Sequence, residues 1–251
     1  MSILSELLFP PKCVACATLL EWSEENKGAF CRSCGAVFQS EKRETCGFCA
    51  RPVSECTCMT EAMQKAGCAG HCKLVYYLHG KNAPVQNRLI FSIKRNRTKR
   101  VFHFLAKELS GGLSALLNAE HIDREAAVVT YVPRRSRAYL EYGIDQAKAL
   151  AKELAQALEL PMVSALQRSG RYQTPQKKLS GRERFHQVKQ AYSVRSRTDL
   201  RGKTVILVDD TVTTGATMAA CIRQLKKAGA KKILCASVAV DDTNRERPEG
   251  Q

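Results

Sequence analysis

The sequence is short of long apolar runs, of aromatic side chains and, in its second part, of acidic ones. No apolar run approaches the ~18 residues of a membrane span. The N-terminal apolar stretch is broken by Glu6 and two prolines and lacks a small-residue cleavage site. These absences predict a cytoplasmic protein that does not insert into a membrane. Aromatic residues make up only 6% of the chain, so base stacking would add little to nucleic-acid binding.

Positive charge is concentrated in the second part of the chain, where acidic residues are scarce. Net charge is +16; residues 1–75 carry eight basic and eight acidic residues, whereas residues 76–251 carry 32 and 16. The first basic cluster comprises Arg88, Lys94, Arg95, Arg97, Lys99 and Arg100. The second comprises Arg168, Arg171, Lys177, Lys178, Arg182, Arg184 and Lys189, with only Glu183 against them. Such clusters suit a polyphosphate ligand or a nucleic-acid backbone, although a solvated face has the same composition.

Ten of the twelve cysteines precede residue 73, and their spacing predicts two zinc sites. Two CxxC pairs separated by 14 residues close a tetrahedral site of four thiolates. A third CxxC pair followed by a CxC pair supplies a second set. The predicted ligands are Cys13, Cys16, Cys31 and Cys34 for the first site, and Cys46, Cys49, Cys56 and Cys58 for the second.

The cysteine pattern leaves some questions open. Any of Cys68, His71 and Cys72 could replace Cys56 or Cys58 in the second site. A disulfide framework is the rival interpretation, but it requires an oxidising compartment. Four protein ligands leave no open position for water, so both zinc ions would be structural and would stabilise a stretch with few apolar residues. Whether this segment also binds nucleic acid is not decided by its sequence.

The stretch from Thr204 to Thr217, TVILVDDTVTTGAT, is the most informative part of the chain. Its continuous apolar run predicts a strand covered on both faces of a parallel sheet. Asp209 and Asp210 follow at the carboxyl end, where open α/β sheets bind ligands. Adjacent carboxylates there can accept hydrogen bonds from vicinal hydroxyls. The loop that follows predicts a phosphate cradle, because it offers hydroxyls, a flexible glycine and the N–H groups that open a helix.

The remaining pattern alternates strands with helices. Strands are expected at 74–78, 126–132 and 233–240, and helical spacing recurs from Val101 to Leu116, interrupted at Gly111-Gly112. Another amphipathic helix is expected from Ile144 to Leu158, and one after Gly215 that ends at Gly229. This alternation predicts an α/β fold with an open, mainly parallel sheet.

The Thr204–Thr217 stretch resembles the binding motif for phosphoribosyl pyrophosphate (PRPP) in type I phosphoribosyltransferases. By that resemblance, Asp209 and Asp210 hold the ribose 2- and 3-hydroxyls, and Mg²⁺ bridges the pyrophosphate and the ribose. The same resemblance places the pyrophosphate in the loop after the 126–132 strand, with Arg134 or Arg135 as its basic contact. The phosphate loop residues implied are Thr211, Thr213, Thr214, Gly215 and Thr217.

With the cysteine pairs, the chain resembles the ComF family, which joins an N-terminal double zinc ribbon to a phosphoribosyltransferase-like domain. That family typically shows R-G-F-N-Q where this chain has Tyr142 to Gln146, so Tyr142 and Asp145 depart from it. A later segment, Arg168 to Arg184, resembles the family loosely. The resemblance implies a zinc ribbon over 1–73 and a type I phosphoribosyltransferase fold over 74–251, with a hood at about 160–195.

Two functions follow from the resemblance. One is a competence protein that binds PRPP and single-stranded DNA during natural transformation, together with DNA-uptake proteins. The alternative is an enzyme that transfers the phosphoribosyl group to an unidentified acceptor and releases pyrophosphate. We favour the first, because no residue pattern for recognising a purine, pyrimidine or orotate is evident. The sequence leaves catalysis, the acceptor and the oligomeric state open.

Overall fold

The computed structural model describes residues 10–20, 28–78, 85–95, 99–134, 144–168 and 191–241. Several predicted residues lie outside these ranges, among them Arg135, Tyr142, Arg97 and most of the second basic cluster. Within the described ranges, no helix is long and apolar enough to cross a membrane.

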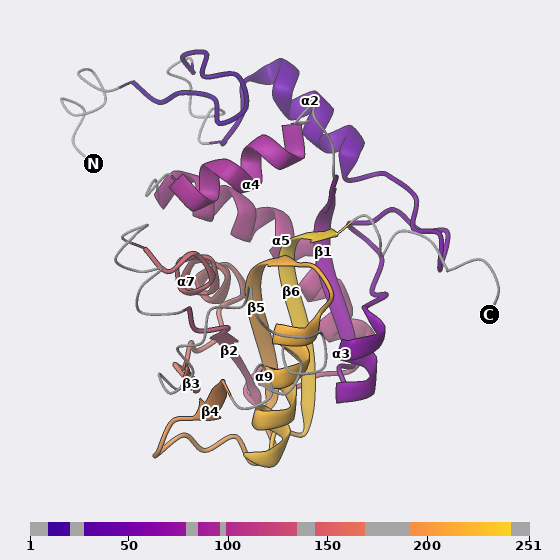
Figure 1. Ribbon diagram of the computed structural model, residues 1–251, viewed down its shortest axis with the longest axis vertical. Coiled ribbons are helices and arrows are strands. Elements are labelled where there is room, and N and C mark those ends of the chain that lie inside the picture. Colours follow the sequence, from indigo (N-terminus) through magenta and orange to yellow (C-terminus); the bar gives the residue numbers. More distant parts are fainter. Residues whose placement is uncertain are drawn as a thin grey trace, which may run out of the picture.

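A four-stranded parallel sheet forms the centre of the molecule (Figure 1). Its order is β1 (Gly70–Tyr77), β6 (Lys232–Asp241), β5 (Thr204–Val212) and β2 (Ala127–Tyr131). All three neighbouring pairs are parallel. The expected α/β fold with an open parallel sheet is therefore confirmed, and β1 begins four residues before the expected strand start.

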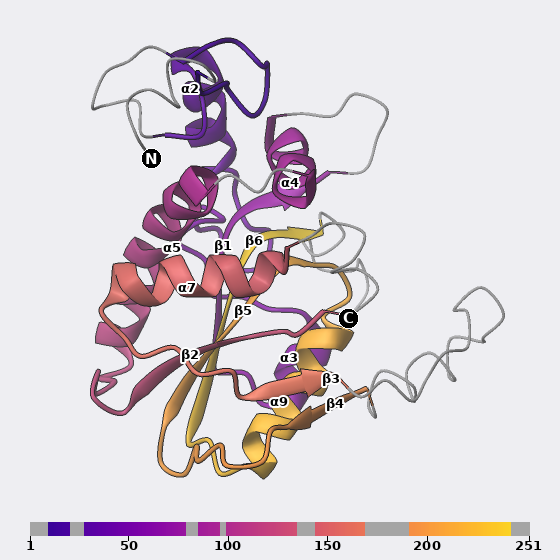
Figure 2. The ribbon, with the colours of Figure 1, turned by 90° about the vertical axis from the view of Figure 1, so that its left-hand side faces the viewer.

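Helices cover both faces of this sheet, because its strands are apolar on both sides. One face carries α5 (Lys99–Ala119) and α7 (Gln146–Leu158), and the other carries α3 (Glu61–Ala66) and α9 (Ala216–Lys227) (Figure 2). The helix α5 runs through Gly111 and Gly112, which interrupt its apolar pattern in the sequence. A β-carbon on Gly112 would lie 3.3 Å from the carbonyl oxygen of Ser54. Glycine there allows the N-terminal segment to approach α5 closely.

The N-terminal segment packs directly on the sheet domain. Its helix α2 (Arg32–Glu41) lies beside α4 (Val85–Arg95), and Phe30 and Phe38 contact Phe104 of α5 with ring centroids 5.7 and 5.8 Å away. Lys42 Nζ also donates to Glu108 Oε2 of α5 at 2.5 Å. Because Phe30 and Phe38 belong to the same buried cluster as α5 and α7, the two parts share one apolar core.

The helix α7 begins where the chain departs from the expected ComF pattern. Asp145 is its N-cap, and its Oδ1 accepts a hydrogen bond from the Lys148 backbone N–H at 3.1 Å. Aspartate and asparagine cap helices equally well. The departure therefore leaves the start of this helix intact.

Candidate functional site: the carboxyl edge of the sheet and two cysteine clusters

The two adjacent carboxylates lie near the carboxyl end of β5, in the middle of the sheet. β5 continues through them to Val212. The backbone N–H of Asp210 donates to Asp209 Oδ1, and the N–H of Thr211 donates to Asp210 Oδ1, both at 2.9 Å. Burial and the neighbouring Asp210 charge raise the pKa of Asp209 well above its ordinary value, and Arg134 opposes this. A ligand that brings hydroxyl donors or a cation would favour the ionised form of the Asp209 carboxyl group.

Arg134 extends from the end of β2 toward these acids. Its guanidinium forms an ion pair with Asp210 Oδ2, and both side chains are largely buried. The structure thus brings together the predicted pyrophosphate contact and one of the predicted ribose contacts, which are 76 residues apart in the chain.

The predicted phosphate loop connects β5 to α9. Thr213 and Thr214 are exposed, and Gly215 adopts a left-handed conformation with φ of 73°. Among the described residues, Thr211 Oγ1 is a buried hydroxyl oxygen with no hydrogen-bond partner. The first N–H groups of α9 open toward the loop, and a helix N-terminus of this kind attracts anions. The loop can therefore hold a phosphate group through hydroxyls, amides and the helix dipole.

Sequence reasoning missed one residue of this loop's surroundings. A β-carbon on Gly215 would overlap Thr60 Oγ1 and would lie 3.1 Å from Met63 Cγ. Thr60 is the N-cap of α3, in the N-terminal part of the chain. No sequence pattern could have indicated this contact, since the two residues are 155 positions apart.

Part of the predicted hood is a small antiparallel sheet of β3 (Leu166–Arg168) and β4 (Tyr192–Val194). Arg168 Nη1 donates to the Tyr192 hydroxyl oxygen at 3.0 Å, and its guanidinium lies 5.1 Å from the ring centroid. Burial raises the pKa of Tyr192 to about 12, and the Thr217 side chain contributes a hydrogen bond that opposes this rise. Tyr192 of β4 therefore contacts the first turn of α9.

Residues 144–250 match the family model of the phosphoribosyl transferase domain. These residues include α7, the β3–β4 pair, β5, the phosphate loop, α9 and all of β6. Arg134, Thr60 and both cysteine clusters precede it.

Solved structures that resemble the chain include three proteins of purine and PRPP chemistry. A hypoxanthine phosphoribosyltransferase from Staphylococcus aureus is 12% identical, with 61% of this chain and 70% of that chain covered at a TM-score of 0.37. An allosteric regulatory enzyme of purine biosynthesis is 23% identical over 62% of this chain and 27% of its own, at a TM-score of 0.35. Glutamine PRPP amidotransferase from B. subtilis, complexed with ADP and GMP, is 24% identical over 62% of this chain and 28% of its own, also at 0.35. Comparison with curated proteins found no match.

The first cysteine cluster lies next to α4 and α5, outside residues 144–250. The ligand atoms of Cys13, Cys16, Cys31 and Cys34 all lie within 4.8 Å of one another. The Sγ atoms of Cys16 and Cys31 are 3.7 Å apart. Thiolates 2.3 Å from a tetrahedral zinc ion are separated by about 3.8 Å, whereas a disulfide bond is about 2.05 Å long. The geometry fits zinc and does not fit a disulfide framework.

The second cysteine cluster uses the predicted CxC pair. The ligand atoms of Cys46, Cys49, Cys56 and Cys58 also lie within 4.8 Å of one another. Burial raises the pKa of the Cys46 thiol, but hydrogen bonds from the Phe48 and Cys49 backbone and from the side chains of Cys56 and Tyr76 together lower it to about 7. The two clusters thus have the donor set of a double zinc ribbon.

The three alternative ligands are engaged elsewhere. Cys68 Sγ lies 3.4 Å from Cys235 Sγ and 3.3 Å from the Gly70 carbonyl oxygen, and Cys72 is buried in the apolar core. His71 Nε2 is 2.8 Å from Ser237 Oγ. Since the Ser237 hydroxyl donates to the Ala239 carbonyl, His71 donates through Nε2. Full burial and the Lys73 charge lower the pKa of His71, so the ring is neutral.

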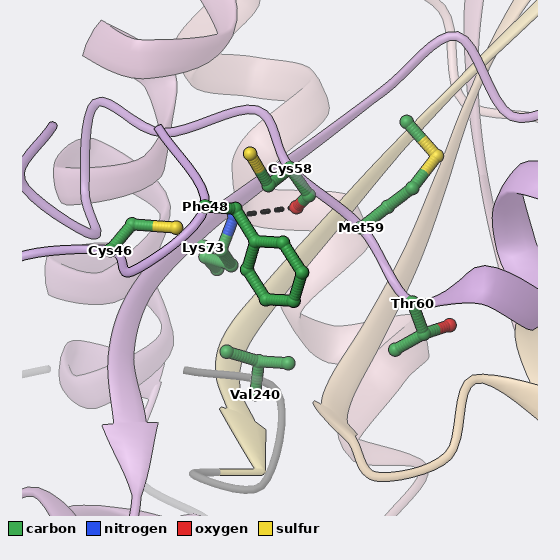
Figure 3. A pocket seen from close by; sticks show the side chains of 7 residues that line it. All are labelled: Cys46, Phe48, Cys58, Met59, Thr60, Lys73 and Val240. Carbon is green, nitrogen blue, oxygen red and sulfur yellow. Dashed lines mark hydrogen bonds between the residues drawn. The ribbon is translucent and has the colours of Figure 1, made fainter. Parts of the chain in front are cut away.

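A buried lysine from β1 reaches the second cluster (Figure 3). Lys73 is 3% exposed, and its Nζ donates to the carbonyl oxygens of Cys56 and Cys58 at 3.1 and 2.7 Å. It also lies 3.3 Å from Cys56 Sγ. A buried ammonium group needs a negative partner. A zinc ion bound by four thiolates would carry net negative charge, which would offset the buried ammonium group of Lys73.

Two members of the first basic cluster are used within the protein. Arg88 Nη1 donates to the carbonyl oxygen of Ala15 at 3.2 Å, and Arg100 Nη2 donates to that of Lys12 at 3.1 Å. Both carbonyls belong to the turn around the first cysteine pair. These two arginines therefore hold the first cysteine cluster against α4 and α5. In contrast, the side chain of Lys99 is 77% exposed.

Proposed function

We propose that the protein binds PRPP with Mg²⁺ at the carboxyl edge of the sheet, with Asp209 and Asp210 on the ribose hydroxyls. The observation that carries this proposal is the Asp209-Asp210 pair, directly followed by a Thr/Gly loop that opens α9, inside a phosphoribosyl transferase domain. Thr213, Thr214, Gly215 and Thr217 take the 5-phosphate, and Thr211 offers its unpaired hydroxyl. Arg134 takes the pyrophosphate, and Arg135 lies outside the described residues.

The positive charge of Arg134 can offset negative charge at this site both without and with the ligand. In the ligand-free arrangement its guanidinium neutralises Asp210. Bound Mg²⁺ would supply positive charge at this edge, and the Arg134 guanidinium would then be available to contact the pyrophosphate. Mg²⁺ prefers carboxylate and phosphate oxygens, so the same edge suits both parts of the ligand.

The test is a comparison of ligand-induced thermal shifts. PRPP with Mg²⁺ should raise the melting temperature of the wild type, because a ligand selective for the folded state stabilises it. The double variant Asp209→Asn/Asp210→Asn should fold and lose the shift. A suitable control is Asp199→Asn, since Asp199 pairs with Arg201 on the surface away from the loop. An equal shift in the double variant would place the ligand elsewhere.

We further propose that this is a ComF-type competence protein of the cytoplasm that engages single-stranded DNA and DNA-uptake partners. Support comes from the basic excess in residues 76–251 and from the two zinc-type clusters in the N-terminal part of the chain. The second candidate is a phosphoribosyltransferase acting on an unidentified acceptor, which the domain match favours. Pyrophosphate release from PRPP, measured with and without single-stranded DNA, separates turnover from binding alone.

A further inference from the structure

The second cysteine cluster is joined to the phosphate loop by a very short piece of chain. Cys58 is the last residue of the cluster, and Thr60 follows two positions later. Thr60 is 5% exposed and caps α3, where its Oγ1 accepts a hydrogen bond from the Met63 N–H at 3.4 Å. In Figure 3 this piece runs from Cys58 past Met59 to Thr60, along one side of a small hollow that Val240 of β6 closes from below.

Thr60 also packs directly against Gly215 of the phosphate loop. Gly215 has no room for a β-carbon, because Thr60 Oγ1 and Cβ and Met63 Cγ occupy that space. Gly215 is in addition left-handed, with φ of 73°, and it starts α9. The position of the loop therefore depends on where the N-terminal segment places Thr60.

The turn that carries Cys56 and Cys58, just before Thr60, is held by contacts with β1. Lys73 Nζ donates to the Cys56 and Cys58 carbonyls, and the His71 backbone N–H donates to the Thr57 carbonyl at 3.1 Å. A metal ion at the cluster would also hold this turn, through Cys56 and Cys58. Without the metal, the contacts between this turn and β1 that remain among the described residues are those of Lys73 and His71. The freed thiolates would take up protons, so the negative charge beside Lys73 would be lost.

We propose that Thr60 is a positioning residue for the phosphate loop and that metal at the second cluster keeps it in place. Metal and phosphoribosyl ligand then bind cooperatively. A loop that is already ordered loses less conformational entropy when it receives a phosphate, so ligand affinity is higher in the metal-bound protein. By linkage, the ligand tightens metal binding by the same factor. This inference rests on the proposed binding of PRPP at the loop.

The first experiment measures PRPP–Mg²⁺ affinity of the full-length, zinc-loaded protein by calorimetry. Thr60→Ala should raise the Kd about 10-fold, within the usual range of coupling between sites, while the zinc content stays unchanged. Thr60→Ser keeps the hydroxyl beside Gly215 and the helix cap, and should stay within about threefold of the wild type. Thr57→Val is the matched control, because it lies in the same turn and its carbonyl contact with β1 is retained. Circular dichroism checks that each variant folds.

The second experiment measures the same coupling through the rate of zinc release. Zinc release to a coloured chelator is followed with PRPP–Mg²⁺ and with Mg²⁺ alone. The ligand should slow the release of one of two zinc ions about 10-fold in the wild type. It should have no such effect in Asp209→Asn/Asp210→Asn or Thr60→Ala. Slowing of neither ion, or of both equally, in a protein that binds PRPP overturns the coupling and leaves the proposed function standing. A wild type that does not bind PRPP at all overturns both.

Discussion

Arg134 donates a hydrogen bond to Oδ2 of Asp210, across the carboxyl ends of two neighbouring strands. The pair brings one positive charge to two adjacent carboxylates that would otherwise repel each other. It therefore stabilises the ligand-free site and occupies the groups that the proposed ligand would contact.

Replacing Arg134 by glutamine should destabilise the ligand-free protein. Asp210 would be left largely buried without its cation, at a cost of about 1–3 kcal/mol at neutral pH. Urea unfolding measures the change in the free energy of unfolding. In Arg134→Gln/Asp210→Asn the two effects should not add, because each single change already removes the same pair. Simple additivity would show that the ion pair contributes nothing.

Replacing Asp209 by asparagine should stabilise the ligand-free protein at neutral pH. Because burial and Asp210 raise the folded-state pKa of Asp209, the unfolded state ionises first as pH rises, and stability is lost from about pH 4 upward. Asparagine does not ionise and keeps the oxygen that accepts from the Asp210 N–H. Thermal melts at pH 7.5 should show a higher Tm, by about 2–4 °C for each kcal/mol relieved. The gain should shrink toward pH 4, and a gain independent of pH would contradict this explanation.

The two cysteine clusters should each hold one structural zinc ion. Protein from zinc-supplemented growth should contain about two zinc ions per chain by metal analysis, the number set by eight thiolates in two tetrahedral sites. Removing zinc with a chelator should abolish amide protection in the cluster segments, while β5 and β6 keep theirs in hydrogen exchange. Zinc contents near zero, or disulfides found by mass spectrometry, would show that the clusters are not metal sites.

Lys73 should control how tightly the second cluster holds its metal. Changing it to glutamine removes the buried cation beside Cys56, and partners of metal ligands typically contribute about 10–100-fold in affinity. One of the two zinc ions should therefore be released faster to a chelator, and the other at the wild-type rate. Lys65→Gln is the control, because Lys65 is exposed on α3 and pairs only with Glu61 among the described residues. Equal release from Lys73→Gln and wild type would count against this role.

Binding of single-stranded DNA should weaken steeply as salt increases. Each phosphate contact contributes about −0.7 to the log–log salt slope on single strands. Charge reversal at Arg95, Arg97 and Lys99 should flatten the slope by about two units if all three contact phosphates. Arg100 is left unchanged, since it holds the first cluster through the Lys12 carbonyl.

Reversal at Lys227 and Lys231, at the far end of α9 from the phosphate loop, serves as the control for that experiment. It should leave the slope closer to the wild-type value than the triple reversal does. Fluorescence anisotropy titrations at several salt concentrations measure the slopes. No binding at low salt would remove the physical basis of the DNA-uptake role and favour phosphoribosyl transfer.

The sequence by itself determined those features that depend on residues near one another. CxxC and CxC spacings place thiolates on one turn, so both sets of four cysteines could be predicted before any fold was known. The apolar run, the two acids and the Thr/Gly loop act within one strand and one turn. The same is true of the Asp145 cap, whose partner is three residues away.

Only the tertiary structure decided which distant segments meet. In the sheet of order β1-β6-β5-β2, Lys73 contacts the second cluster and Arg134 contacts Asp210. Thr60 packs against Gly215. The structure also shows that Arg88 and Arg100 of the first basic cluster donate hydrogen bonds to the turn of the first cysteine cluster. No local spacing encodes such contacts, because they arise when burial of apolar faces on both sides of the sheet brings separate strands and loops to one edge.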